Sequence, residues 1–226
     1  MKKYIEFKTI EEAKIYGRKY FGSWLKDFQI GSEYRQIYSI SDSIYDFFVM
    51  KHGKEKADIL KEEVKIYRAF SYYCGGNYGL AINQLCRYGH QIFGFKDSIV
   101  KELIELMKKE ILKYNIYENI IAFRVLDYND LLNTVGTKKI IIDQILTDNG
   151  FMGVGLVKDE LIKEHSGYDT ILQIYIPKEC NGLYLDLISN RSEEQEILFF
   201  PGSRLKVLSN KKRFKKQRVI VCEMLY

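Results

Sequence analysis

The amino-acid sequence predicts an α+β protein in which helices come first and a largely antiparallel β-sheet region follows. In the first half, apolar residues recur at intervals of three and four, which is the period of an amphipathic helix. From about residue 119 the pattern changes to short runs rich in β-branched and aromatic residues, separated by Gly, Asn, Asp or Ser. Because helices and strands are segregated along the chain, an alternating α/β fold is disfavoured.

Length and composition indicate a globular chain with a substantial core. The chain has 226 residues, of which 46% are hydrophobic, and no linker or repeat interrupts it. We therefore expect one domain over residues 1–226, helical to about residue 115 and β-rich over 119–226. No signal peptide and no membrane span is expected, because the N-terminus lacks an apolar region and no run of 18 apolar residues occurs. The cysteines lack metal-ligand spacing, so no metal site is expected.

The predicted helices begin with a capping box, Thr9 followed three residues later by Glu12, which starts a helix that ends at about Tyr20. Trp24 and Leu25 are then expected to anchor the next turn in the core. Further helices are predicted over residues 43–50, 54–69, a short segment after the Gly75-Gly76-Asn77 turn, and 97–113. The predicted strands are residues 120–126, 150–157, 170–177, 182–189, 196–200, 204–209 and 218–225.

Glu194 and Glu196 stand at the beginning of the predicted strand 196–200 with one residue between them. In extended backbone, side chains at positions i and i+2 point to the same side, so both carboxylates can face one cleft. Because glutamates are common on protein surfaces, a solvated acidic turn is the more ordinary explanation of this spacing taken alone.

The remaining polar features have ordinary explanations. Lys and Arg crowd residues 211–218, which we interpret as a solvated loop between strands; a contact with an acidic partner or membrane surface is the alternative. Nucleic acid is not expected as a partner, because Phe214 is the one aromatic residue there for base stacking. His52, His90 and His165 have no Cys or Ser in a triad-like context, and we interpret them as surface or packing histidines.

Three motifs occur in a fixed order along the chain: Phe123-Arg124 in a predicted strand, Gly150 to Leu156 in a second, and Glu194-Gln195-Glu196 before a third. This ordered set resembles the bacterial ADP-ribosyltransferase exotoxin domain, in the branch of binary actin-modifying toxins, their insecticidal relatives and C3-type enzymes. The resemblance extends over nearly the whole chain. It implies a two-sheet, mainly antiparallel β core of the ADP-ribosyltransferase type behind the N-terminal helices.

The resemblance implies a mono-ADP-ribosyltransferase that cleaves NAD and transfers ADP-ribose to a protein side chain. Glu196 matches the catalytic glutamate, because a carboxylate beside the ribose stabilises an oxocarbenium-like transition state. Glu194 matches the residue that selects and activates the acceptor, and a glutamate there accompanies arginine acceptors. Two alternatives stay open: a non-catalytic docking domain of a toxin, and an NAD glycohydrolase that transfers ADP-ribose to water.

The resemblance also implies residues that bind NAD as a substrate. Arg124 and Arg87 match arginines that contact NAD, and a guanidinium group can hold a pyrophosphate bidentately. Asn83 and Gly153 match further NAD-contacting positions. The family's S-T-S motif is replaced here by Gly153-Val154-Gly155, so the hydroxyls that support the catalytic glutamate are missing and reduced activity is expected.

Other departures and the setting follow from the same resemblance. An aromatic and an arginine that line the family's NAD site correspond to Thr170 and Gln173, and an aromatic acceptor-recognition residue corresponds to Arg191. The implied partners are a protein acceptor, such as actin or another host protein, and a translocation component. The implied location is secreted, or delivered into a target cell without a visible signal peptide, and otherwise cytoplasmic.

Overall fold

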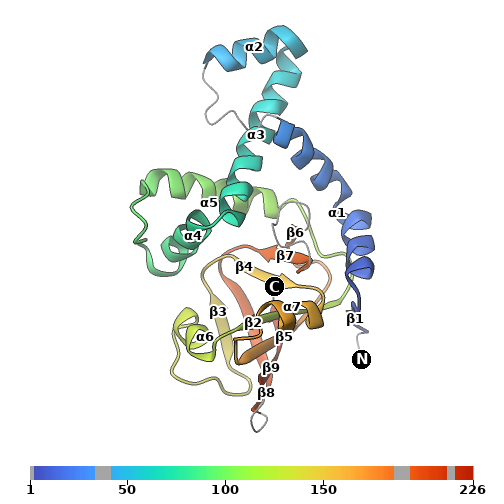
Figure 1. Ribbon diagram of the computed structural model, residues 1–226, viewed down its shortest axis with the longest axis vertical. Coiled ribbons are helices and arrows are strands. Elements are labelled where there is room, and N and C mark those ends of the chain that lie inside the picture. Colours follow the sequence, from blue (N-terminus) through green and yellow to red (C-terminus); the bar gives the residue numbers. More distant parts are fainter. Residues whose placement is uncertain (1–2, 34–41, 186–193, 213–216, 226) are drawn as a thin grey trace.

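The computed structural model describes residues 3–33, 42–185, 194–212 and 217–225. Its helices are α1 (Ile10–Glu33), α2 (Asp42–His52), α3 (Lys54–Cys74), α4 (Asn77–Tyr88), α5 (Asp97–Ile111), α6 (Tyr128–Thr134) and α7 (Lys158–Glu164). Its strands are β1 (Ile5–Glu6), β2 (Ile120–Leu126), β3 (Ile145–Asp148), β4 (Met152–Gly155), β5 (Thr170–Ile176), β6 (Leu183–Tyr184), β7 (Glu196–Phe199), β8 (Ser203–Lys212) and β9 (Arg218–Leu225). The predicted α+β order is confirmed. In Figure 1, α2 to α5 lie toward the top of the molecule, and α1 runs down one side to β1.

The described strands form one hydrogen-bonded sheet, which corrects the expectation of two sheets. The strand order is β3-β8-β9-β5-β2-β4-β7-β6, and β1 pairs with β2. The two halves of this path meet at a single register pair between β2 and β4, Phe123↔Gly155. Strand pairing joins residues that are far apart in sequence. The local sequence pattern therefore cannot show whether two groups of strands are hydrogen-bonded to each other in one sheet. Most pairs are antiparallel, as predicted; β1–β2 and β5–β9 are parallel.

The first helix shows how closely the local patterns predict structure. The Thr9 hydroxyl accepts a hydrogen bond from the backbone N–H of Glu12 at 3.2 Å, and the Glu12 carboxylate accepts one from the N–H of Lys8 at 2.7 Å. Near the predicted end at Tyr20 the structure has a kink instead, where Phe21 leaves helical geometry (φ −119°, ψ 17°) and α1 continues beyond it. The pattern therefore located a real break in the helix, but not its end.

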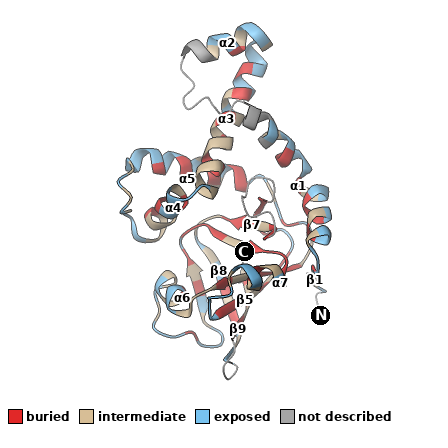
Figure 2. Ribbon diagram, viewed as in Figure 1, coloured by how far each residue is buried: buried red, intermediate tan, exposed pale blue. Residues whose placement is uncertain are grey.

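The hydrophobic core is shared between the helices and the sheet. One cluster of buried side chains contains Trp24, Phe70 and Met107 from the helices together with Leu172 and Leu198 from the strands. Figure 2 shows buried residues concentrated in the strands and on the inward sides of α1, α3 and α5, whereas much of α2 and α6 is exposed. This shared core supports the proposal that the chain forms one domain.

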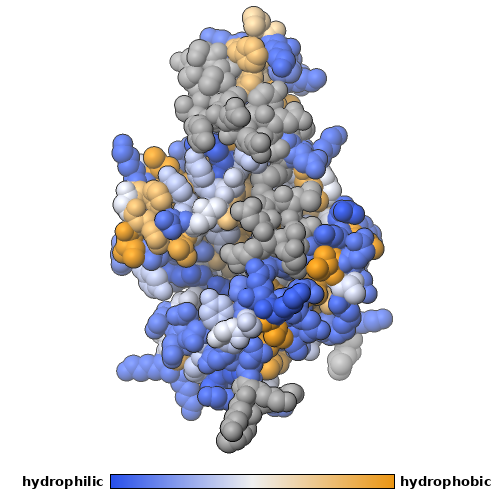
Figure 3. Space-filling model, in the orientation of Figure 1, coloured by the Kyte–Doolittle hydropathy of each residue, from blue (hydrophilic) through white to orange (hydrophobic). Residues whose placement is uncertain are grey.

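The molecular surface is mostly polar, with some apolar side chains gathered over α4 and α5. Leu80 of α4 and Ile99 of α5 are among the exposed large hydrophobic residues. Figure 3 shows apolar side chains over this part of the molecule, on the left. Among the described helices, none combines the length and the apolar character needed to cross a membrane.

We predict that Gly17→Ala destabilises the protein, although Gly→Ala usually stabilises a helix interior by roughly 0.5–1 kcal/mol. A Cβ atom on Gly17 would lie 2.1 Å from Cε1 of Tyr184, whose ring is buried. That ring is not free to move away, because its hydroxyl donates a hydrogen bond to Gln195. We expect a loss of about 1–3 kcal/mol in urea unfolding.

The matched control is Gly22→Ala in the same helix, where a Cβ atom would meet nothing within 4 Å. It should leave stability unchanged or slightly raised. If Gly17→Ala proves as stable as Gly22→Ala, the close packing of α1 on Tyr184 is wrong.

Candidate active site

A cleft of about 560 Å³ lies between α4, β2, β4 and α7, and it collects the residues that the sequence singled out. Among the residues that line it are all of the predicted site residues: Asn83, Arg87, Arg124, Gly153, Glu194 and Glu196. Neither Thr170 nor Gln173 is among the lining residues, whereas His165 and Tyr168 are. Arg191 lies outside the described residues, and so do residues 213–216 of the basic stretch.

One wall of the cleft is built around Asp148, a buried residue at the end of β3 that the sequence analysis did not single out. Its carboxylate accepts hydrogen bonds from Nε and Nη2 of Arg87 at 2.8 and 2.9 Å, and from Nη1 of Arg124 at 3.1 Å. The backbone N–H of Gly150 donates a further bond at 2.8 Å. Asp148 therefore holds an arginine of α4 and an arginine of β2 side by side in the cleft wall.

This network fixes the charge of the wall. Burial by itself would raise the pKa of Asp148, but the hydrogen bond from Arg87 and the positive charges of Arg124 and Arg87 outweigh it, so this pKa is lowered. For Arg87, burial would lower the pKa, but the hydrogen bond and the charge of Asp148 outweigh it and raise the pKa. Both ions persist, and the remaining N–H groups of the two guanidiniums can meet an anionic ligand.

Asn83, which lies on α4 like Arg87, connects this helix to the residue before β4. Its side-chain oxygen accepts a hydrogen bond from the backbone N–H of Phe151 at 2.8 Å. Gly150 is needed between these groups, because a Cβ atom there would lie 2.6 Å from Nε of Arg87 and 2.8 Å from the Asn83 side-chain oxygen. The glycine thus lets α4 and the entry to β4 approach each other closely.

The two carboxylates line another part of the cleft. Glu194 is buried and Glu196, the first residue of β7, is half-buried; both line the cleft, as predicted. The sequence analysis expected extended backbone to bring both carboxylates into the cleft, but the backbone between them is not extended. Gln195 has φ +52°, in the left-handed region. The Gln195 side chain is buried and accepts a hydrogen bond from the Tyr184 hydroxyl, which anchors this turn in the core.

A family model for the ADP-ribosyltransferase exoenzyme matches residues 49–226 of the chain. The chain belongs to the ADP-ribosyltransferase exoenzyme family. This confirms the resemblance inferred from the three ordered motifs. No sequence among the curated proteins matches the chain significantly.

Solved structures of this family share the fold at low sequence identity. The C3 exoenzyme of Clostridium limosum has a TM-score of 0.68 and 18% identity, covering 99% of this chain and 98% of the other. C3stau2 from S. aureus, solved with NAD, has a TM-score of 0.66 and 16% identity, covering 99% of each. BECa, an ADP-ribosylating toxin of a binary enterotoxin of C. perfringens solved with NADH, has a TM-score of 0.68 and 15% identity. The match to BECa covers 99% of this chain and 50% of the BECa chain.

In this exoenzyme-family chain the glycines of β4 lie directly against the site. A Cβ atom on Gly153 would lie 1.9 Å from Oε1 of Glu196, so the carboxylate occupies the space beside the glycine. Tyr73 is half-buried nearby. The pKa of its hydroxyl is raised by removal from water and by the negative charge of Glu196, so the hydroxyl keeps its proton. A side chain at position 153 would require the carboxylate of Glu196 to move.

His165 reaches the site from the end of α7, contrary to its interpretation as a surface or packing histidine. Its Nε2 atom lies 3.1 Å from Oε1 of Glu194. The potential ligand atoms of Glu164, His165 and Glu194 lie within 4.8 Å of one another, and these residue types can hold a divalent metal ion. No sequence pattern reveals the contact, because the residues belong to different elements and the pairing depends on the packing of α7.

A second cavity of about 330 Å³ adjoins the first and shares the two carboxylates with it. The rest of its lining comes from the end of α3 and the first turns of α4, and no Lys, Arg or His is among its described lining residues. Glu194 and Glu196 therefore stand between a cavity with an arginine wall and a cavity whose charged groups are acidic.

We predict that Asp148→Asn destabilises the protein by about 3 kcal/mol at pH 7, because it leaves two partly buried arginines without their carboxylate. The lowered pKa means that ionised Asp148 stabilises the fold above the ordinary aspartate pKa, and that this contribution is lost as the pH falls through the lowered value. In urea titrations, the gap between wild type and variant should therefore narrow below about pH 4.

The control is Asp143→Asn, whose ion pair with Lys206 at 3.1 Å is largely exposed and worth at most about 1 kcal/mol. Equal stability losses for the two variants, or a gap that does not change with pH, would contradict the role of Asp148.

Proposed function

We propose that the chain is a mono-ADP-ribosyltransferase that cleaves NAD and transfers ADP-ribose to a protein side chain, with arginine as the acceptor. The observation that carries this proposal is the shared cleft, which is lined by Glu196 together with two arginines held by a buried aspartate. The family membership supports NAD as the substrate, and C3stau2 is a relative whose structure was solved with NAD.

In this proposal the arginine wall binds the pyrophosphate of NAD. Arg87 and Arg124 are oriented before the ligand arrives, so little side-chain freedom is lost on binding. Bidentate contacts from guanidinium groups suit phosphate oxygens better than a single ammonium group does. Asn83 and Gly153, which line the same cleft, are further contacts in this proposal.

Glu196 supports the bond-breaking step. The bond between C1′ of the ribose and the nicotinamide nitrogen breaks, its electron pair leaves with nicotinamide, and positive charge develops on the ribose. A nearby carboxylate stabilises this oxocarbenium-like state, as in glycoside cleavage. The acceptor nitrogen then forms the new bond to C1′ and loses a proton, which in this proposal the Glu194 carboxylate accepts as general base.

The second cavity favours a cationic acceptor. The two carboxylates face it and no cationic side chain is among its described lining residues, so a guanidinium group would be attracted there. The acceptor protein belongs, in this proposal, to a host cell that receives the enzyme, in keeping with an exoenzyme family. A translocation component stays a prediction from the resemblance.

We predict that the protein labels one or more host proteins when incubated with NAD labelled in the ADP-ribose part and a host-cell lysate, and that Glu196→Gln reduces labelling at least about 100-fold. The amide keeps the size of the side chain but removes the negative charge that stabilises the ribose cation. Label on protein and free nicotinamide should be measured in the same reaction.

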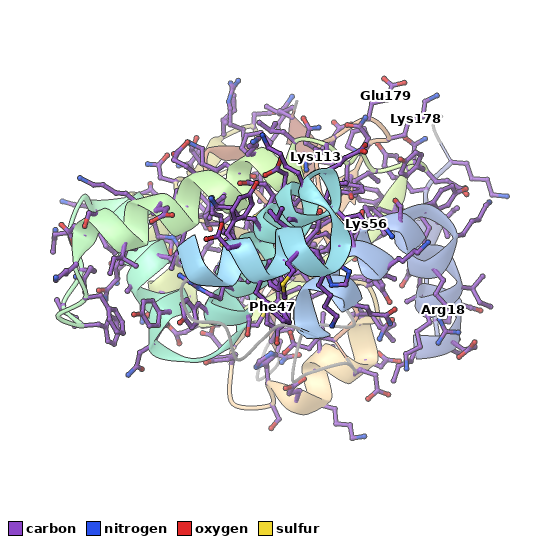
Figure 4. The ribbon with its side chains drawn as sticks, turned by 90° about the horizontal axis from the view of Figure 1, so that it is seen from above. Arg18, Phe47, Lys56, Lys113, Lys178 and Glu179 are labelled. Carbon is purple, nitrogen blue, oxygen red and sulfur yellow. The ribbon has the colours of Figure 1, made fainter. Side chains whose placement is uncertain are left out.

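The matched control is Glu179→Gln, in the turn after β5, whose side chain is 72% exposed and points away from the protein in Figure 4. It should label as wild type does. Nicotinamide release without labelled protein would show a glycohydrolase, whereas neither product from wild type would indicate the docking domain and overturn the catalytic proposal.

A further inference from the structure

His165 contacts Glu194 and has no part in the reaction described above. The Nε2 atom of His165 lies 3.1 Å from Oε1 of Glu194, in side chains that are 22% and 9% exposed. An ionised carboxylate only accepts hydrogen bonds, so Nε2 carries the hydrogen whenever Glu194 is ionised. The contact therefore directs one carboxylate oxygen toward α7 and limits the rotation of the Glu194 side chain.

The packing of α7 against β4 places His165 there. A Cβ atom on Gly155 would lie 2.5 Å from Cδ1 of Leu161 and 2.8 Å from the backbone oxygen of Glu194. A glycine at this position thus lets both the helix and the carboxylate turn approach the strand. The backbone N–H of His165 donates a hydrogen bond to the carbonyl oxygen of Leu161, one helical turn earlier, at 2.9 Å. This bond fixes the end of α7 beside the cleft.

The imidazole is held from a second side as well. The ring of Tyr168 lies 5.6 Å from the His165 ring, centroid to centroid, and the backbone N–H of Tyr168 donates to the carbonyl of His165 at 3.1 Å. Both rings line the cleft. A ring that is packed and backbone-anchored in this way is a better support for a carboxylate than a freely rotating surface side chain.

We propose that His165 is a positioning residue that holds the Glu194 carboxylate for the acceptor, so that it sets the share of cleaved NAD that reaches protein rather than water. This inference rests on the proposed transferase function. The same two glycines of β4 give it a structural basis: position 153 leaves room for the Glu196 carboxylate, and position 155 leaves room for the helix that carries His165. Support for the Glu194 carboxylate comes here from the end of α7.

The consequence is a separation of two rates. Glu196 acts on the ribose of NAD, whereas His165 acts through Glu194 on the acceptor. Loss of the histidine should therefore slow transfer to protein more than it slows NAD cleavage. A purely structural role would lower both rates together, through loss of folded protein.

The experiment compares His165→Leu and His165→Gln with wild type, and measures labelled protein and nicotinamide release at saturating NAD. His165→Leu removes the donor and should lower transfer about 10-fold, with nicotinamide release in the absence of acceptor within about twofold of wild type. His165→Gln carries an amide N–H that can replace Nε2–H, and it should recover most of the transfer rate.

The control is His90→Gln, an exposed histidine outside the cleft lining, which should match wild type in both rates. Thermal unfolding of each variant corrects the rates for the folded fraction. The inference is overturned if His165→Leu leaves the ratio of transfer to cleavage unchanged, or if His165→Gln loses as much transfer as His165→Leu. A wild-type protein that releases no nicotinamide and labels nothing overturns the proposed function as well.

Discussion

The buried carboxylate of Asp148 connects parts of the protein that are far apart in sequence. The carboxylate accepts hydrogen bonds from α4, from β2 and from the turn before β4. The backbone oxygen of Asp148 accepts another hydrogen bond, from the backbone N–H of Gly202 after β7. A charge removed from water in this way is tolerated only when its partners are close and correctly oriented. The position of the arginine wall, and with it the shape of the cleft, depends on this one group.

The carboxylate wall is supported from the helical half by a different route. Trp24 of α1 donates its Nε1–H to the backbone oxygen of Tyr184 at 3.0 Å, and the Tyr184 hydroxyl donates to Gln195, between the two glutamates. Helix α1 also packs closely against Tyr184 at Gly17. Both walls of the cleft are thus set by contacts between the helices and the sheet, which explains why the site needs the helical part and not only the strands.

The sequence predicted the long elements well because each carries its own local pattern. The helix over 97–113 is found as Asp97–Ile111, and the strand over 120–126 is found with the same bounds. The short elements β1, β3, α6 and α7 were missed, since a few residues give too little periodicity to recognise. The division into two sheets was wrong for a related reason, because one register pair between β2 and β4 joins them.

In the candidate site too, some residues were found from sequence motifs and others are revealed only by tertiary contacts. Six residues named from the ordered motifs and from the family resemblance line one cleft, because they lie on strands, in the turn before β7 and on one face of α4 that meet there. Asp148 and His165 were not recognised as site residues: an aspartate before Asn-Gly looks like an ordinary turn residue, and an isolated histidine looks like a surface one. Their importance comes from contacts with Arg87, Arg124 and Glu194, which only the three-dimensional structure brings together.

The central claim is that the arginine wall and the carboxylate turn form a binding site for NAD. Calorimetric titration of the protein with NAD tests it most directly, with Arg124→Lys as the comparison. The account predicts saturable binding to one site in the wild type, and affinity weaker on the order of 10-fold in the variant, which keeps the charge but loses the bidentate geometry. Heats that do not saturate in the wild type, or equal affinities for both proteins, would contradict it.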